Sequence, residues 1–256
     1  MIPLPRFFID PSAVSGDTVT LTGENARHAS YSLRLAPGDR ISVCDQQTAY
    51  TCEMVSFDGE SATARILASC PIDTEPPFVA RLYQALPKGD KLDTVIQKAV
   101  ECGVSEVTPF ESSRCIVRAK PEAEARKTER RCRIAEEAAK QCGRGIIPPV
   151  YPTVSYAAAL ESASTADLVL FCYEGSDVSP LPAILKDAAP KLRRITESGR
   201  TPEIAIFVGS EGGFSPEEAT AAASRGCAMT GLGKRILRTE TASGFVLSCL
   251  VYALEL

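Results

Sequence analysis

The stretch Ile204-Ala205-Ile206-Phe207-Val208-Gly209-Ser210-Glu211-Gly212-Gly213-Phe214 joins an apolar run to a glycine-rich loop. A short, continuous apolar run is typical of a strand buried in a parallel sheet. A second junction of this kind links Ala228-Met229-Thr230 to Leu232-Gly233-Lys234-Arg235-Ile236-Leu237-Arg238. Loops that follow parallel strands lie at the carboxyl edge of the sheet, where open α/β folds bind ligands. The sequence therefore predicts that the two loops wall one pocket.

A helix is predicted after each loop. Ser215-Pro216-Glu217-Glu218 supplies an N-cap serine, a proline at the first helical position and a glutamate three residues after the cap. The segment 240–254 is apolar on nearly every side. Such a helix must be buried, either within the fold or against another subunit.

Strands and helices also alternate upstream, which predicts a parallel sheet. A strand over residues 79–86, a helix over 91–102 and a strand over 104–110 follow one another. The remaining predicted elements are a helix over 122–142, a weak strand near Val150, a helix from Tyr156, a strand over 167–173, a loop with Pro180 and Pro182, and exposed helix and loop over 186–201.

The first part of the chain has a different pattern. Short alternating or β-branched runs at 18–22, 40–44 and 62–67 are separated by Pro-Gly-Asp and Asp-Gly turns, which predicts a small β-barrel. One helical interruption is expected near residues 24–33. Because residues 70–77 are rich in proline, we place a linker there and predict two domains, 1–72 and 77–256, in a mixed α/β protein.

Composition narrows the class of protein. A chain of 256 residues that is 45% hydrophobic can bury a substantial core. It has no apolar run of the roughly 18 residues that a membrane span needs, so we expect a soluble cytoplasmic protein. Its ten cysteines form no C-x-x-C pair and His28 is the single histidine, so we expect free thiols and no metal site. One histidine also disfavours a Ser-His or Cys-His hydrolase.

The glycine loops do not match phosphate-binding motifs. Gly231-Leu232-Gly233-Lys234-Arg235 lacks the upstream glycine and the following Ser or Thr of a P-loop, and the chain contains no G-x-G-x-x-G. Glu211 disfavours phosphate through charge repulsion. A ligand with cationic or neutral groups fits better. The alternative is that the glycines only permit tight turns, but the presence of a second loop favours the pocket.

With the continuation Thr239-Glu240-Thr241-Ala242, the two loops resemble the cofactor loops of SPOUT methyltransferases, and specifically the RsmE family. RsmE enzymes methylate N3 of a uridine in 16S ribosomal RNA. Further matching segments occur in order along the chain: Pro5-Arg6-Phe7-Phe8, Leu33-Arg34-Leu35 with Pro37-Gly38-Asp39, Lys88-Gly89-Asp90-Lys91, Gln97-Lys98-Ala99, Glu101-Cys102-Gly103-Val104, Glu137-Ala138 and Gln141-Cys142-Gly143-Arg144.

The resemblance implies an N-terminal PUA-like RNA-binding barrel and a C-terminal SPOUT domain with a trefoil knot. It also implies S-adenosylmethionine as cofactor, a homodimer, and 16S ribosomal RNA or the small ribosomal subunit as partner. The cofactor contacts carried over are Leu170, Glu174, Val208, Gly209, Glu211, Gly212, Gly213, Leu232, Gly233, Ile236, Leu237, Arg238, Thr241 and Ala242. Glu174 could equally be an exposed loop acid.

Arg238 is the predicted catalytic residue. The uracil imide is protonated at neutral pH, so the enzyme must favour its anion. The second domain has no histidine. We therefore expect Arg238 to stabilise negative charge on the uracil oxygens, since an arginine is a poor base.

RNA contacts are expected where cations gather. The net charge of the chain is −4, yet residues 114–144 hold ten Lys or Arg against five Glu. The stripe Arg126, Arg130, Arg133 on one helix face could bind phosphate, although a solvated face is the favoured interpretation for the stripe alone. His28 is assigned no chemistry. The resemblance implies RNA contacts at the matching positions Arg114, Arg118, Gln141 and Arg144, and we expect further contacts at Lys88 and, in the barrel, at Arg6 and Arg34.

The sequence departs from the family at two places. Ser210 stands where the family usually has proline, and Ser112-Ser113-Arg114-Cys115 is a loose version of its Glu-Arg-Ser segment. Two other functions stay open: a SPOUT methyltransferase that modifies another RNA base, and a non-catalytic RNA-binding assembly factor in which the loops are packing turns. A nucleotide hydrolase is disfavoured because phosphate motifs are absent.

Overall fold

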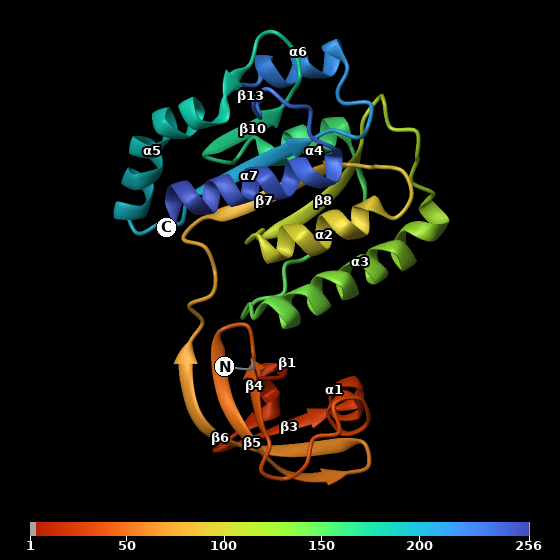
Figure 1. Ribbon diagram of the computed structural model, residues 1–256, viewed down its shortest axis with the longest axis vertical. Coiled ribbons are helices and arrows are strands. Elements are labelled where there is room, and N and C mark those ends of the chain that lie inside the picture. The colour runs from red at the N-terminus through yellow and green to blue at the C-terminus, as the bar shows by residue number, and fades with distance from the viewer. Residues whose placement is uncertain (1–3, 256) are drawn as a thin grey trace. The chain divides into compact units, whose positions relative to one another are not determined.

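A computed structural model describes residues 4–255 and divides into two compact units (Figure 1). The first unit contains the chain up to Glu75 together with Ala139–Ile147. The second contains Pro76–Ala138 and the chain from Pro148 onward. The chain therefore passes between the units at three places, whereas the composition of the linker predicts a single boundary.

The first unit is built on a six-stranded sheet in the order β1-β4-β5-β6-β3-β2. Neighbouring strands pair antiparallel except β1 with β4, and register shifts in the β5–β6 pair interrupt its ladder. The strands are β1 (Arg6–Phe8), β2 (Val14–Ser15), β3 (Thr18–Thr22), β4 (Arg40–Cys44), β5 (Thr48–Asp58) and β6 (Ser61–Pro71).

Alternation of side chains builds the core of this unit. In β3, Val19 and Leu21 are fully buried, whereas the alternating threonines are exposed or partly covered. Phe7, Ile41 and Met54 complete this core from β1, β4 and β5. A short helix α1 (Gly23–Arg27) and the π-helical segment η2 (His28–Ser32) interrupt the strands where a helical segment was predicted.

The second unit has a seven-stranded parallel sheet in the order β11-β13-β10-β12-β7-β8-β9. The run 204–208 is buried in the middle of this sheet, in agreement with its continuous apolar pattern. The strands are β7 (Val79–Ala85), β8 (Glu106–Glu111), β9 (Val154–Ser155), β10 (Leu168–Cys172), β11 (Ser179–Pro180), β12 (Glu203–Val208) and β13 (Ala228–Gly231).

Helices cover the sheet of the second unit. In Figure 1, α7 lies beside α2 and across the strands, and it contacts β7 and β12. Val246, Leu247 and Leu250 are fully buried on this side of α7, whereas Phe245 and Tyr252 are 39% and 78% exposed. The helices are α2 (Lys91–Glu101), α3 (Pro121–Cys142), α4 (Tyr156–Ala163), α5 (Leu181–Glu197), α6 (Pro216–Ser224) and α7 (Thr239–Leu254).

The proline-rich segments differ from the sequence predictions. Pro71 is still part of β6, because the long β5–β6 hairpin continues into the segment predicted as linker. Pro180 ends the short strand β11, and Pro182 lies in the first turn of α5, where a loop was predicted. A proline in the first helical turn removes no intrahelical hydrogen bond, so these prolines start a helix rather than prevent one.

Within residues 4–255, every helix is too short or too polar to cross a lipid bilayer.

Candidate cofactor site

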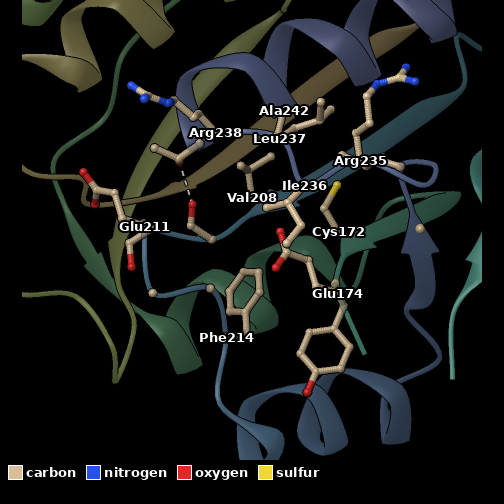
Figure 2. Close-up of a pocket in the computed structure, with 18 of the residues that line it drawn as sticks. Cys172, Glu174, Val208, Glu211, Phe214, Arg235, Ile236, Leu237, Arg238 and Ala242 are labelled. Carbon is tan, nitrogen blue, oxygen red and sulfur yellow. Dashed lines mark hydrogen bonds between the residues drawn. The ribbon is translucent and has the colours of Figure 1, made fainter. Parts of the chain in front are cut away.

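Loops that follow three neighbouring strands enclose a cavity of about 710 Å³ in the second unit. Residues after β10, β12 and β13 line it, together with the first turn of α7. Figure 2 shows Val208, Ile236, Leu237 and Ala242 gathered around this space, with Phe214 on another side. The volume falls within the roughly 300–1,000 Å³ range of small-molecule sites. Both glycine-rich loops thus wall the same cavity.

The loop after β12 is closed by its own backbone. The amide of Gly213 donates to the carbonyl of Ser210 at 2.9 Å, and Gly213 has a φ of +64°, a conformation that favours glycine. A Cβ on Gly209 would lie 3.0 Å from the Cα of Gly213. A side chain at Gly209 would therefore push the two ends of the turn apart.

Glu211 ties this loop to the segment that precedes α2. Its carboxylate accepts from Lys91 Nζ at 2.7 Å and from the backbone amide of Lys88 at 3.2 Å. Burial raises the pKa of Glu211, but these hydrogen bonds outweigh burial and hold its pKa below the ordinary value of 4.5. Glu211 is thus a charged anchor at the edge of the cavity.

The opposite side of the loop is held by the segment after β8. Glu218, in the first turn of α6, accepts from the backbone amides of Ser113 at 2.7 Å and Ser215 at 2.9 Å. Ser215 accepts in return from the amide of Glu218, so the predicted capping box is present. Arg114 Nη1 donates to the carbonyl of Gly212 at 3.1 Å.

Aromatic packing supports the loop from the core. The Phe214 ring is 2% exposed and lies 4.2 Å from the Phe171 ring centroid. It also stacks on Phe110 at 6.2 Å, with Tyr156 beside it at the same distance. The turn therefore rests on a rigid base.

The loop after β13 is more open to solvent. Ile236 is 82% exposed, and Gly233 has a φ of +103°. Arg238 is the N-cap residue of α7, its side chain is 82% exposed, and its guanidinium lies 3.9 Å from Glu240. In Figure 2 the guanidinium groups of Arg235 and Arg238 point outward to opposite sides. These cations therefore lie at the mouth of the cavity.

Most of the predicted cofactor contacts lie in the cavity wall. Leu170 and Thr241 do not: Leu170 is fully buried within β10, where it pairs with Ile206 and Ala228, and Thr241 is exposed on α7. The predicted residues that line the cavity are Glu174, Val208, Gly209, Glu211, Gly212, Gly213, Leu232, Gly233, Ile236, Leu237, Arg238 and Ala242.

Gln84 and Thr239 were not among the site residues predicted from the sequence. Gln84 lies in β7 and is fully buried, and its Nε2 donates to Thr239 Oγ1 at 2.9 Å. Thr239 Oγ1 donates in turn to the carbonyl of Gly209 at 2.6 Å. The available signal was a lone amide in an otherwise buried strand, near its carboxyl end.

Two side chains predicted to contact RNA, those of Arg6 and Arg144, bind other groups of the first unit. Arg144 is 6% exposed and pairs with Glu75. Arg6 Nη1 donates to the carbonyls of Gly143 at 2.5 Å and Arg144 at 2.8 Å. The guanidinium of Arg144 is therefore buried and already paired, and its contact with RNA stays a prediction. Arg6 is half-buried and holds the chain after α3.

The other predicted RNA contacts are exposed. Arg118 donates to the carbonyls of Ser112 at 3.0 Å and Ser113 at 3.3 Å. Arg34 has a φ of +54° in a turn of the first unit. Lys88 precedes α2 and Gln141 lies in the last turn of α3. Within the second unit, Lys88 and Arg118 lie near the first glycine loop: the amide of Lys88 donates to Glu211, and Arg118 binds the segment 112–113 that precedes Arg114.

The donor set of the cavity fits a cofactor with cationic groups. Glu174 and Glu240 line the wall, and backbone groups of both loops surround the space, whereas Glu211 is already paired with Lys91. The buried Ser210 Oγ and Glu240 Oε2 have no hydrogen-bond partner among the described residues. Carboxylates suit the ammonium and sulfonium groups of S-adenosylmethionine, and the volume suits its size.

Two family models, one for each unit, identify the class of protein as an RNA methyltransferase that carries a PUA domain. The RNA methyltransferase domain family matches residues 74–251, and the RNA methyltransferase PUA domain family matches residues 21–67. The predicted PUA-like first domain and parallel-sheet methyltransferase domain are thereby confirmed.

Individual relatives narrow this class. Ribosomal RNA small subunit methyltransferase E of Bacillus subtilis is 31% identical, covering 99% of this chain and 98% of that protein. The protein of the same name from Synechocystis is 30% identical, covering 98% and 78%. A crystal structure of ribosomal RNA small subunit methyltransferase E from Neisseria gonorrhoeae bound to S-adenosyl methionine matches with a TM-score of 0.82 and 30% identity, over 97% of each chain. The chain belongs to the ribosomal RNA small subunit methyltransferase E family, as its sequence predicts.

Proposed function

We propose that the protein transfers a methyl group from S-adenosylmethionine to N3 of a specific uridine in 16S ribosomal RNA. One observation carries this proposal: the loops after β12 and β13 wall a single cavity of suitable volume. Membership of the family and the likeness to a cofactor-bound structure support it.

The cavity residues hold the cofactor in this proposal. S-adenosylmethionine supplies an activated methyl group on a sulfonium. The backbone of Gly209–Gly213 and of Leu232–Leu237 binds its polar groups, while Val208 and Ala242 cover its apolar parts. Glu174 offers a carboxylate to a cationic group. Leu170 supports the wall from within β10, and Thr241 acts from the exposed side of α7.

Arg238 acts on the uracil in this proposal. Methylation at N3 requires the imide proton to leave, and the negative charge that develops spreads onto the uracil oxygens. A guanidinium at the mouth of the cavity can stabilise that charge while the base is aligned with the methyl group. The 82% exposure of the Arg238 side chain supports this role, because the group is open to an incoming RNA base.

Lys234 and Arg235 supply phosphate contacts in this proposal. Within residues 4–255 neither side chain makes a hydrogen bond or ion pair, and both lie at the mouth of the cavity. Cations that are already free of partners can neutralise phosphate without first breaking an ion pair. Arg114, which also lines the cavity, extends this contact. Exposed Arg34, Lys88, Arg118 and Gln141 remain RNA-contact candidates.

We further propose that the second unit contains a trefoil knot and that the protein acts as a cytoplasmic homodimer. The exposed Phe245 and Tyr252 of α7 support the dimer, because an isologous interface would bury them. The partner is 16S ribosomal RNA, free or within the small ribosomal subunit.

Base mapping tests this function. Small subunits and free 16S RNA from a strain that lacks the gene are incubated with purified protein and methyl-labelled cofactor, and the RNA is digested to nucleosides. The proposal predicts label in N3-methyluridine at one position. Label in another base would identify a different RNA methyltransferase, and bound RNA without label would identify a non-catalytic assembly factor.

A further inference from the structure

Gln84 is a polar residue in the buried part of a strand, where its side-chain amide is cut off from water. It is fully buried in β7, near the carboxyl end of the strand. Burying an amide costs free energy unless its groups are hydrogen-bonded, and Gln84 Oε1 has no partner among the described residues. An apolar residue of similar size would avoid this cost. Stability alone therefore does not explain the glutamine.

The amide nitrogen of Gln84 connects the elements around the cavity. It donates to Thr239 Oγ1 at 2.9 Å and to the carbonyl of Ala85 at 3.0 Å. It also approaches the carbonyl oxygens of Val208 at 3.5 Å and Gly209 at 3.4 Å. A single side chain thus connects β7 to the end of β12 and to the start of α7.

The Thr239 hydroxyl extends this connection. Because the amide nitrogen of Gln84 can only donate, the hydroxyl accepts from it and gives its own proton to the carbonyl of Gly209 at 2.6 Å. Gly209 begins the first loop, and Thr239 directly follows the second. Both residues line the cavity, whereas Gln84 lies behind the wall.

We infer that Gln84 and Thr239 are positioning residues for the cofactor: their hydrogen bonds fix the spacing between the two loops that wall the cavity. This inference rests on the proposed function. A site that is already set at the right width loses less free energy on ordering when the ligand binds. Without the hydroxyl, the loops keep their sequence but lose the bond that holds them together.

Substitutions at Thr239 test the inference. Thr239→Val removes the hydroxyl and keeps the shape, whereas Thr239→Ser keeps the hydroxyl. Thr220→Val is the matched control, because among the described residues Thr220 Oγ1 bonds only within α6, to the carbonyl of Pro216. Calorimetry with S-adenosylmethionine and no RNA, well below the unfolding temperature, should give about tenfold weaker binding for Thr239→Val. Thr239→Ser and Thr220→Val should stay within about twofold of wild type.

A double-mutant cycle gives a second readout. Gln84→Met removes the amide at similar length, and its loss of affinity should not add to that of Thr239→Val, because both act through the same bonds. If Thr239→Val does not fold, Gln84→Met compared with Thr239→Ser makes the same test. Wild-type affinity in both Gln84→Met and Thr239→Val, or fully additive losses, would overturn the inference. Failure of the wild-type protein to bind the cofactor would instead overturn the proposed function.

Discussion

Arg238 is the residue on which the proposed chemistry depends, and its exposure gives a clear prediction. Because its guanidinium lies at the mouth of the cavity, Arg238→Ala should lower turnover by about 10²–10³-fold, as removal of a charge-stabilising donor does. Cofactor affinity should change little. Arg133→Ala is the control, since Arg133 is an exposed arginine that pairs with Glu129 on α3. Single-turnover methylation and calorimetry separate the two effects, and equal losses in both would contradict the role.

Lys234 and Arg235 are predicted to act on RNA rather than on the cofactor. Each unpaired cation that meets a phosphate releases counterions, so each alanine substitution should lower the slope of log affinity against log salt by about 1. Affinity for S-adenosylmethionine should stay at the wild-type value. Filter binding of 16S RNA over a salt series measures the slope. An unchanged slope in the variant that lacks both cations would show that these side chains do not contact the RNA phosphates.

At the scale of elements, two glycines of the second unit behave differently because their surroundings differ. A Cβ at Gly209 would meet the backbone of Gly213 at 3.0 Å, whereas a Cβ at Gly244 in α7 meets nothing within 4 Å. Gly209→Ala should therefore open the loop and weaken cofactor binding. Gly244→Ala should stabilise the helix by about 0.5–1 kcal/mol. Thermal unfolding and calorimetry test both, and a destabilised Gly244→Ala would reveal a contact on that side of α7.

Sequence alone was sufficient for elements whose pattern is local. The buried run before Gly209, the capping box from Ser215 to Glu218 and the alternation in β3 depend on nearby residues. They form as predicted. The segment with Pro180 and Pro182 was predicted as a loop, but it begins a helix. A proline breaks a helix when it lies in the interior and is tolerated when it lies in the first turn.

Long-range pairings could not be predicted in this way. The hydrogen bond between Gln84 and Thr239 joins residues 155 positions apart, so nothing near Gln84 in the sequence predicts this partner. For the same reason, Arg144 and an exposed arginine look alike in sequence, and only the fold reveals Glu75 beside it. Leu170 matched a family position, but its side chain faces the core of the sheet.

For the whole molecule, the ion pair between buried Arg144 and partly buried Glu75 carries a prediction about stability. Both residues belong to the first unit, although in the sequence the segment Pro76–Ala138 of the second unit separates them. Arg144→Ala leaves the Glu75 carboxylate without its cation, and should lower the free energy of unfolding by about 3 kcal/mol. Arg118→Ala, whose side chain is 53% exposed, should cost less than about 1 kcal/mol. Urea unfolding measures the free energy of unfolding of both variants. A larger loss in Arg118→Ala than in Arg144→Ala would contradict the structural role of the Arg144–Glu75 pair.

The most direct test of the central claim is a calorimetric titration of the full chain with S-adenosylmethionine in the absence of RNA. If the loops after β12 and β13 form one cofactor cavity, the wild-type protein binds one molecule per chain, and Gly209→Ala binds it more weakly. No saturable binding by folded wild-type protein, or equal binding by wild type and Gly209→Ala, would contradict the account.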